Sequence, residues 1–264
     1  MYQGSLTIEK KGNYKNEIEF CKVSFKYPNV DTYVLKNVSL KFTMGERLAI
    51  VGENGSGKTT FIKLLCRLYD PTEGAILLNG IDIRKYDYRE YMDIFSVVFQ
   101  DFRLLSLKLG ENVATSADYD EVRVHGCLEG AGFGKRLATL DAGLDTMLYK
   151  DFDDSGIDVS GGEEQKIALA RALHKDATFI ILDEPTAALD PIAEYEVYNR
   201  MNEITEGKTA IFISHRLSSC RFCQDIVVFH EGKLIQQGSH DTLVEDVHGK
   251  YHELWHAQAQ YYVD

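Results

Sequence analysis

The chain has 264 residues, enough for one large domain or two modest ones, and its 44% hydrophobic and 27% charged residues are normal for a water-soluble globular protein. The 29 Lys and Arg residues are outnumbered by 41 Asp and Glu residues, so the formal net charge is −12. This balance argues against a protein that binds duplex nucleic acid through a basic face, but it leaves room for a small local anion site.

After a loosely held lead-in of about 15 residues, short apolar runs predict β-strands. Gly52–Gly57 then interrupts the pattern, and from Lys58 to Tyr69 the apolar spacing becomes helical. A turn at Asp70–Gly74 is expected to end that helix. The predicted strands of this part are Ile18–Tyr27, Val38–Phe42 and Leu48–Val51.

The most specific motif lies at the junction of the last strand and the helix. The pattern G-x-x-x-x-G-K-[ST] of phosphate-binding loops is matched by Gly52-Glu53-Asn54-Gly55-Ser56-Gly57-Lys58-Thr59-Thr60. Glycines allow backbone N–H groups to surround a phosphate, and the helix N-terminus adds partial positive charge. We expect the Lys58 ammonium to reach the β- and γ-phosphates and the Thr59 hydroxyl to coordinate Mg²⁺. The alternative is a chance glycine turn, which the strand–loop–helix context disfavours.

Two further strands, Ala75–Leu78 and Phe95–Phe99, precede a mostly helical, more polar stretch that is expected to form an inserted subdomain, about residues 104–175. Within it, Ser160-Gly161-Gly162-Glu163 has the form of an N-cap and capping box that open a helix over Gln165–His174. Two glycines in a first turn each cost about 1 kcal/mol relative to alanine. Their bare N–H groups at a positive helix end would form a second anion site. We therefore expect a cap and a phosphate contact in the same place.

The next strand, Phe179–Leu182, leads into two adjacent carboxylates, Asp183 and Glu184. Such an apolar run is typical of a buried parallel strand, and carboxylates are costly inside a sheet. This strand end is therefore expected to open onto a ligand crevice. Asp183 would hold the Mg²⁺ shell, and Glu184 would take a proton from an attacking water. The alternative is that Asp183 and Glu184 only mark the solvent-exposed end of the strand. The phosphate loop elsewhere in the chain makes this alternative less favoured.

The rest of the chain continues to alternate helices and strands, which predicts a parallel sheet with helices on both faces. The expected elements are a helix over Ile192–Ile204, strands over Ala210–Ile213, Ile226–Phe229 and Lys233–Gln237, and a helical tail over Asp241–Tyr262.

The cysteines and the apolar runs predict a cytoplasmic, water-soluble chain. Five scattered cysteines disfavour a disulfide framework and favour a reducing compartment. No apolar run approaches the roughly 18–20 residues of a membrane span, and the polar segment Met1–Lys15 is unlike a signal peptide. Cys220 and Cys223 form a CxxC motif without a second ligand pair, so two core or helical thiols are favoured over metal or redox use.

Three motifs, in this order and spacing, resemble the nucleotide-binding domain of ATP-binding cassette (ABC) transporters. They are the phosphate loop, VSGGE at Val159–Glu163 and ILDEPTAALD at Ile181–Asp190. The resemblance runs from about Ile18 to the C-terminal helix, and it makes residues 1–15 a lead-in and 16–264 the domain. It implies an α/β fold: a RecA-like P-loop NTPase core with a mainly parallel sheet, an N-terminal antiparallel β subdomain and the inserted α-helical subdomain. It also implies an ATPase that uses ATP and Mg²⁺.

The resemblance assigns further roles. Tyr27 matches the aromatic residue that stacks on adenine, although it could equally be a core ring at a strand end. Gln100 resembles the glutamine that reaches Mg²⁺ and the attacking water, with a polar loop residue as the alternative. His215 resembles the switch histidine that contacts the γ-phosphate and orients the general base, with a structural histidine as the alternative. Ala188–Asp190 resembles the loop by which each subunit senses the other's site.

The implied site is therefore catalytic at Glu184, His215 and Gln100, with Mg²⁺ held by Thr59, Gln100 and Asp183. The sequence departs from the family pattern at Val159, where leucine is commonest, and at Glu163, where glutamine is usual. Neither change removes Ser160 or the backbone donors. The segment Lys150–Gly156 replaces the exporter-type T-E-V-G-E-like run, which weakens residue-level claims about contact with a second transmembrane helix bundle.

The resemblance implies a head-to-tail dimer, of identical or different copies, in which ATP lies between the phosphate loop of one copy and Ser160, Gly161 and Gly162 of the other. Hydrolysis would let the dimer open, so the dimer would alternate between a closed state with ATP and an open state after hydrolysis. Gln100 and the loop at Phe102, Leu104 and Leu105 would pass the motion to a transmembrane domain, and local core packing is the alternative for that loop.

The transmembrane partner is expected to be fused N-terminally in the full-length protein, at the cytoplasmic face of the membrane. The end of the chain, with Gly238–Asp241, Tyr251, Leu254 and Gln258, resembles an exporter-type half-transporter, which makes an excised domain more favoured than a separately encoded subunit. The alternatives are a non-transport ABC ATPase and an ATP-gated interaction module. The VSGGE motif argues against a P-loop kinase or GTPase, because those families lack it. No nucleic-acid partner is expected at a net charge of −12.

Overall fold

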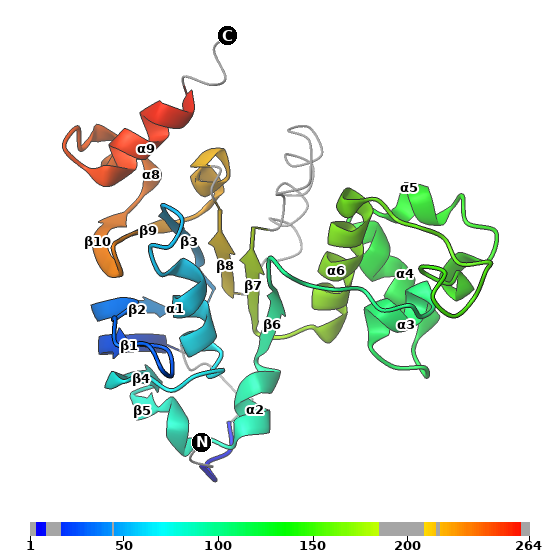
Figure 1. The fold of residues 1–264 in the computed structure, drawn as a ribbon, viewed down its shortest axis with the longest axis horizontal. Helices are drawn as coiled ribbons and strands as arrows, with labels where there is room; N and C mark the ends of the chain where they lie inside the picture. Colours follow the sequence, from blue (N-terminus) through cyan, green and yellow to red (C-terminus); the bar gives the residue numbers. More distant parts are fainter. Residues whose placement is uncertain (1–3, 9–16, 44, 185–208, 215–216, 260–264) are drawn as a thin grey trace. The chain divides into compact units, whose positions relative to one another are not determined.

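The computed structural model describes residues 4–8, 17–43, 45–184, 209–214 and 217–259. The chain divides by its contacts into two compact units (Figure 1). The first unit comprises Met1–Phe95 and Gly207–Asp264, and the second comprises Ser96–Glu206.

An antiparallel sheet forms one part of the first unit, with the strand order β2-β1-β4-β5. In this sheet Ile18 pairs with Phe42 on one side and with Leu78 on the other. The burial of β2 largely alternates along the strand, as expected of a sheet with one face on the core. The strands are β1 (Glu17–Phe25), β2 (Leu35–Thr43), β4 (Glu73–Leu78) and β5 (Ile81–Asp82).

A mainly parallel arrangement forms the other part of the first unit, with the strand order β10-β9-β3-β8. Strand β3 runs parallel to both β8 and β9, and β10 pairs antiparallel with β9. All five residues of β8 are buried and four of them are apolar, as expected of a strand that is covered on both faces. The strands are β3 (Arg47–Gly52), β8 (Thr209–Ile213), β9 (Asp225–His230) and β10 (Lys233–Gly238).

Helix α1 (Lys58–Leu65) joins the two sheets of the first unit through one aromatic side chain. The ring of Phe61 stacks on Phe20 of β1 at 4.2 Å between centroids and lies 5.6 Å from Phe229 of β9. The other helices of this unit are η1 (Ile83–Lys85), α2 (Tyr88–Asp93), η3 (Leu217–Phe222), α8 (His240–Glu245) and α9 (Lys250–Ala259).

Helix α1 is shorter than the predicted Lys58–Tyr69. It ends at Leu65 because Arg67 adopts a left-handed conformation, with φ 52°. The guanidinium of Arg67 is fully buried, and it donates hydrogen bonds to the carbonyls of Ile83 and Tyr86, both at 3.2 Å. Apolar periodicity within the helix cannot reveal these distant acceptors.

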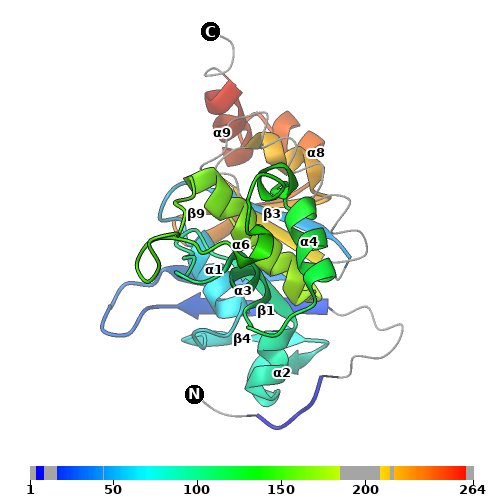
Figure 2. The same cartoon turned by 90° about the vertical axis from the view of Figure 1, so that its right-hand side faces the viewer.

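The second unit holds a helical cluster and two neighbouring strands. Helix α6 packs against both α3 and α4, which lie beside it in Figure 2. Arg171 of α6 donates a hydrogen bond to the carbonyl of Asn112 in α3 at 2.7 Å. The elements are β6 (Phe95–Val98, whose first residue belongs to the first unit), α3 (Leu109–Ala114), α4 (Glu121–Gly130), α5 (Gly134–Leu137), η2 (Gly143–Asp145), α6 (Gly161–Lys175) and β7 (Phe179–Asp183).

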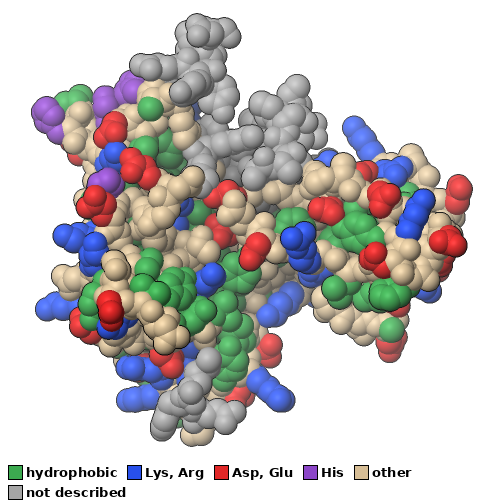
Figure 3. Space-filling view, in the orientation of Figure 1, with side chains coloured by type: hydrophobic (Ala, Val, Ile, Leu, Met, Phe, Trp, Pro, Cys, Tyr) green, Lys and Arg blue, Asp and Glu red, His purple; other side chains and the backbone are tan. Residues whose placement is uncertain are grey.

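The C-terminal tail forms two helices where the sequence predicts one. Helices α8 and α9 are separated at residues 246–249, and histidine side chains gather over this end of the first unit (Figure 3). The predicted helix over Ile192–Ile204 lies outside the described residues. The predicted strands are present within one or two residues of their expected bounds, except that β2 begins at Leu35, three residues before the expected Val38. The predicted mixed α/β class with a parallel-rich sheet is confirmed.

Two further findings concern the CxxC thiols and the length of the helices. Cys220 and Cys223 are buried, and burial raises the pKa of the Cys223 thiol to about 12, so this thiol stays protonated near neutral pH. Among the described residues, no helix combines the length and apolar composition needed to cross a membrane.

Candidate functional site

The loop between β3 and α1 has the backbone conformation that its glycines predict. Gly55 and Gly57 have φ of 77° and 107°, a region that favours glycine. Gly57 is the N-cap of α1 and provides no side-chain cap, so the first N–H groups of the helix face the loop without a competing side chain. At Gly52 a Cβ atom would lie 2.2 Å from the carbonyl oxygen of Phe229, so only glycine fits there. This loop is a cradle of backbone donors at a positive helix end.

Lys58 folds back over the loop. Its Nζ donates hydrogen bonds to the carbonyls of Gly52 at 2.8 Å and Glu53 at 3.0 Å, and the residue is buried. Ser56 is also buried, and its Oγ has no hydrogen-bond partner among the described residues. Thr59 is half-buried in the first turn of α1. The loop therefore brings an ammonium group and hydroxyl groups to the same backbone cradle.

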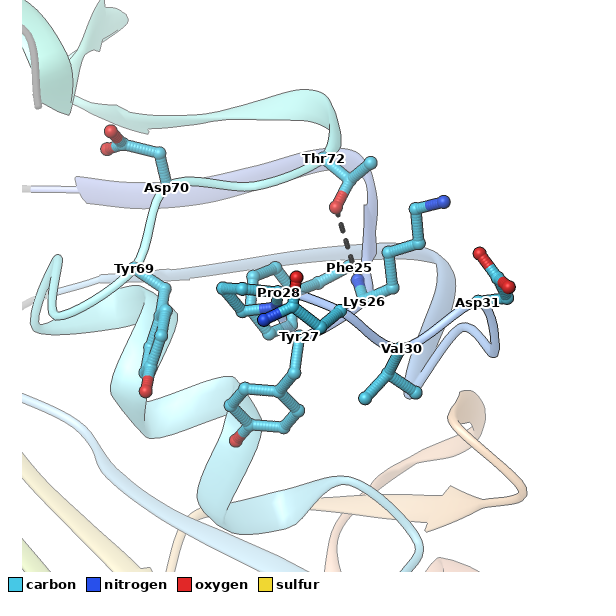
Figure 4. Close-up of a pocket in the computed structure, with 10 residues that line it drawn as sticks. Phe25, Lys26, Tyr27, Pro28, Val30, Asp31, Tyr69, Asp70 and Thr72 are labelled. Atoms are coloured by element: carbon cyan, nitrogen blue, oxygen red, sulfur yellow. Dashed lines mark hydrogen bonds between the residues drawn. The ribbon is translucent and has the colours of Figure 1, made fainter.

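Tyr27 follows β1 and lines a hollow of about 400 Å³ (Figure 4). Its ring packs edge-to-face on Phe25 at 5.0 Å and on Tyr69 at 5.2 Å between centroids. Its hydroxyl is 3.0 Å from Thr60 Oγ1, which ties the hollow to the first turn of α1. The ring of Tyr27 is thus held by neighbouring aromatic rings, as a core ring would be, and it also borders open space, as a ring that stacks on a ligand must.

Glu53 has partners that the sequence did not suggest. Lys250, the first residue of α9, lies 2.8 Å from Glu53 Oε1, and His230 lies 3.8 Å from Oε2. The hydrogen bond and the positive charge of Lys250 lower the pKa of the Glu53 carboxyl. The negative charge that the loop carries at Glu53 is therefore balanced from the C-terminal helix.

In the second unit, β7 ends in a buried Asp183, and Glu184 follows it with φ 55°. Gln100 Nε2 donates a hydrogen bond to Glu184 Oε2 at 3.0 Å. Gln165 Nε2 donates to the Glu184 carbonyl at 3.0 Å. The structure thus brings Gln100 and Glu184 together and adds Gln165 of α6, which no sequence motif indicates. A left-handed conformation at a non-glycine residue is a strained one that the surrounding bonds maintain.

The first turn of α6 has the expected capping box. Ser160 Oγ accepts the N–H of Glu163 at 3.3 Å, and Glu163 Oε2 accepts the N–H of Ser160 at 2.8 Å. Ser160 and Gly161 are exposed, so the helix end is accessible. Tyr149, which directly precedes the segment Lys150–Gly156, donates a hydrogen bond to Glu164 in the same turn.

Two expected groups lie outside the described residues. His215 and the Ala188–Asp190 loop belong to segments whose structure is not described. The phosphate loop belongs to the first unit, and Gln100, Ser160, Asp183 and Glu184 belong to the second. Each unit therefore presents a polar group of its own: a backbone cradle with an ammonium in one, and a carboxylate pair with an amide and a helix N-terminus in the other.

Known proteins match this chain over nearly its whole length. The family described as ABC transporter matches residues 35–187. The ATP-dependent lipid A-core flippase of Burkholderia orbicola is 39% identical over 246 residues, which are 93% of this chain and 41% of the flippase. The subtilin transport ATP-binding protein SpaT of Bacillus subtilis is 42% identical over 236 residues, which are 87% of this chain and 38% of SpaT.

A solved structure described as a bacterial Atm1-family ABC exporter with ATP bound superposes with a TM-score of 0.86 at 34% identity, covering 97% of this chain and 44% of the exporter chain. The chain therefore spans about two fifths of the length of the curated relatives it matches.

Proposed function

Because the chain belongs to the ABC transporter family, we propose that it binds and hydrolyses MgATP and that this reaction drives the export of a solute across a membrane. The names of its relatives support this direction, since they include a flippase, a subtilin transport ATP-binding protein and an exporter. The transported solute and the complete transporter are part of the proposal, because this chain corresponds to about two fifths of those proteins.

The conformation of the phosphate loop is the observation that carries the proposal. A cradle of backbone N–H groups closed by Lys58 fits a triphosphate, because the donors converge on one side of a helix N-terminus. The hollow beside Tyr27 has the aromatic lining that a nucleobase requires. We assign the triphosphate to residues 52–60 and the adenine to Tyr27.

Magnesium fits the donor set of Thr59, Gln100 and Asp183. All three offer hard oxygen atoms, and Mg²⁺ prefers such ligands with retained water. Because Gln100 Nε2 is directed at Glu184, its amide oxygen is left for a cation. When bound, Mg²⁺ would neutralise charge on the β- and γ-phosphate oxygens.

Glu184 is the proposed general base. Its carboxylate takes a proton from a water whose oxygen forms a bond to the γ-phosphorus, while the bond from that phosphorus to the β–γ bridging oxygen breaks, releasing ADP and phosphate. Gln100 holds the carboxylate and Gln165 holds the main chain behind it, so the base is oriented before the substrate arrives. His215 is assigned to contact the γ-phosphate.

Dimerisation and docking complete the proposal. Ser160, Gly161 and Gly162 would bind the γ-phosphate held by a second copy, in a head-to-tail arrangement. A transmembrane domain would dock on the loop after Gln100, where Leu105 and Leu107 are exposed, and on the neighbouring Phe152, which is 86% exposed. The hydrogen bond that Ser106 donates to Asp151 links these two loops.

The Glu184→Gln variant tests the base and the dimer together. We expect it to bind MgATP with the affinity of the parent, to lose phosphate release by about 10²-fold or more, and to accumulate as an ATP-bound dimer in sedimentation. Adding Lys58→Ala to the same variant is the control, and it should abolish the dimer. Wild-type turnover in Glu184→Gln would disprove the base assignment. If the parent itself released no phosphate, an ATP-gated interaction module would replace the ATPase.

A further inference from the structure

An ion pair joins Arg136 of α5 to Glu163 in the first turn of α6. Arg136 Nε lies 2.9 Å from Glu163 Oε1. The other carboxylate oxygen, Oε2, accepts the backbone N–H of Ser160 at 2.8 Å and its hydroxyl at 2.9 Å. The carboxylate of Glu163 therefore lies between Arg136 and the serine that caps the helix.

Glu163 is an anion at neutral pH. Burial acts to raise the pKa of its carboxyl, but the hydrogen bonds from Ser160 and the positive charge of Arg136 together lower it. A full negative charge thus lies at the helix end where the proposed function places a γ-phosphate. The carboxylate also engages the hydroxyl of Ser160, which is one of the donors that a phosphate would need. Two anions in one place repel each other unless a cation compensates one of them.

Arg136 is oriented before any ligand binds. Its Nη1 donates a hydrogen bond to Thr139 Oγ1 at 3.2 Å, and the Thr139 hydroxyl donates to the Arg136 carbonyl at 2.7 Å. The pair borders a hollow of about 570 Å³, and the side chain of Arg136 is 41% exposed. A half-exposed ion pair contributes little to folding stability, so its removal should act on the charge of the site and hardly on the fold.

We propose that Arg136 is a positioning residue for the phosphate contact of Ser160. By balancing the charge of Glu163 and holding its Oε1, Arg136 allows the Ser160 hydroxyl and the amides of Gly161 and Gly162 to be presented to an anion. The inference rests on the proposed function, in which that anion is the γ-phosphate bound by a second copy. Arg136 does not touch the phosphate in this scheme and acts through Glu163.

The test measures the dimer dissociation constant by sedimentation equilibrium with MgATP, in the Glu184→Gln background. Arg136→Ala should weaken the dimer at least about tenfold, because an uncompensated carboxylate then faces the phosphate. Adding Glu163→Gln to Arg136→Ala should restore the parent value, because the charge is gone while an amide can still accept from Ser160. Arg136→Lys should leave the dimer dissociation constant close to the parent value, because lysine keeps the positive charge beside Glu163.

Lys135→Ala is the matched control, because it removes one positive charge from an exposed position of the same helix and should leave the dimer unchanged. Thermal unfolding without nucleotide and the affinity of the monomer for MgATP should be the same for all variants.

A parent-like dimer in Arg136→Ala, or failure of Glu163→Gln to rescue it, overturns the role of Arg136 and leaves the proposed function standing. A Glu184→Gln parent that forms no dimer with MgATP overturns the proposed dimer itself, and this inference with it.

Discussion

Arg67 illustrates how a single buried cation organises the chain around the phosphate-binding helix. Its side chain is fully buried, donates to the carbonyls of Ile83, Tyr86 and Arg84, and lies 3.7 Å from Asp70 and 5.5 Å from the ring of Tyr88. Removing one partner from such a network leaves buried carbonyls without donors, which is more costly than the bonds are worth. The end of α1 is thus determined by bonds to residues some 16 to 19 positions later.

Replacing this residue should destabilise the fold. We expect Arg67→Met to lower the free energy of unfolding by about 2–4 kcal/mol, measured by urea denaturation. Arg89→Ala, which removes the same charge from an exposed position of α2, should change it by less than about 0.5 kcal/mol. Equal stability of the two variants would show that the buried network of Arg67 contributes nothing.

At the scale of the element, α8 and α9 form a C-terminal pair held by polar as well as apolar contacts. Tyr251 is fully buried, its N–H donates to Gln236 Oε1 at 2.9 Å, and its hydroxyl lies 2.9 Å from His240 Nδ1. The ring of His240 lies edge-on to Trp255 at 4.6 Å between centroids. The first residue of α9, Lys250, also bonds to the phosphate loop through Glu53, so this helix pair is connected to the candidate site.

Protonation of His240 should loosen this pair. Burial lowers the pKa of His240, the positive charge of Arg221 lowers it further, and Asp241 opposes the shift. The folded state therefore takes up its proton at a lower pH than the unfolded state, whose value is about 6.5. The stability that this contact contributes is therefore fully present above the unfolded pKa of about 6.5, and it is lost as the pH falls towards the lower pKa of the folded state.

The only tryptophan of the chain, Trp255, reports on this titration. Its fluorescence should change with a midpoint below about pH 6.5, because a neighbouring imidazolium quenches indole emission. His240→Gln should remove the transition, whereas His248→Gln, at an exposed position after α8, should retain it. An unchanged transition in His240→Gln would contradict the assignment.

At the scale of the whole molecule, the proposed reaction draws on residues from both compact units. Lys58 belongs to the unit with the phosphate loop, and Asp183 belongs to the unit with the carboxylate pair. A ligand that binds only the folded chain stabilises it by mass action, by about 2.7 kcal/mol when its concentration is 100 times its dissociation constant. Nucleotide binding should therefore be visible as a change in global stability.

MgATP should raise the unfolding temperature of the chain in calorimetry, and each unit should be needed for the effect. Lys58→Ala should abolish the rise, since the charge-assisted phosphate contacts are lost. Asp183→Asn, or a chelator added to the parent, should remove the part that depends on magnesium. Lys63→Ala, in the same helix as Lys58, should retain the full rise. A full rise in Lys58→Ala would contradict the phosphate-loop assignment, and a full rise in Asp183→Asn would contradict the metal assignment.

Much of the fold and part of the site follow from local patterns. The strands around Leu48–Val51 and Phe179–Leu182 and the loop at Gly52–Lys58 can be recognised because apolar periodicity and glycine spacing act within a few residues. The roles of His215 and Ala188–Asp190 and the boundaries of the helical insertion at about 104–175 remain predictions. The catalytic roles of Gln100 and Glu184 also remain predictions, although the structure places their side chains within hydrogen-bond distance.

The sequence by itself determined the family, the phosphate loop and the capping box of α6, since each is written in neighbouring residues. Only the tertiary structure decided that Arg67 ends α1, that Gln165 holds the main chain of Glu184, that Arg136 balances Glu163 and that Lys250 balances Glu53. The physical reason is the same in each case. The partners are separated along the chain by 16 to 197 residues, so their pairing depends on the path of the backbone and not on any local preference.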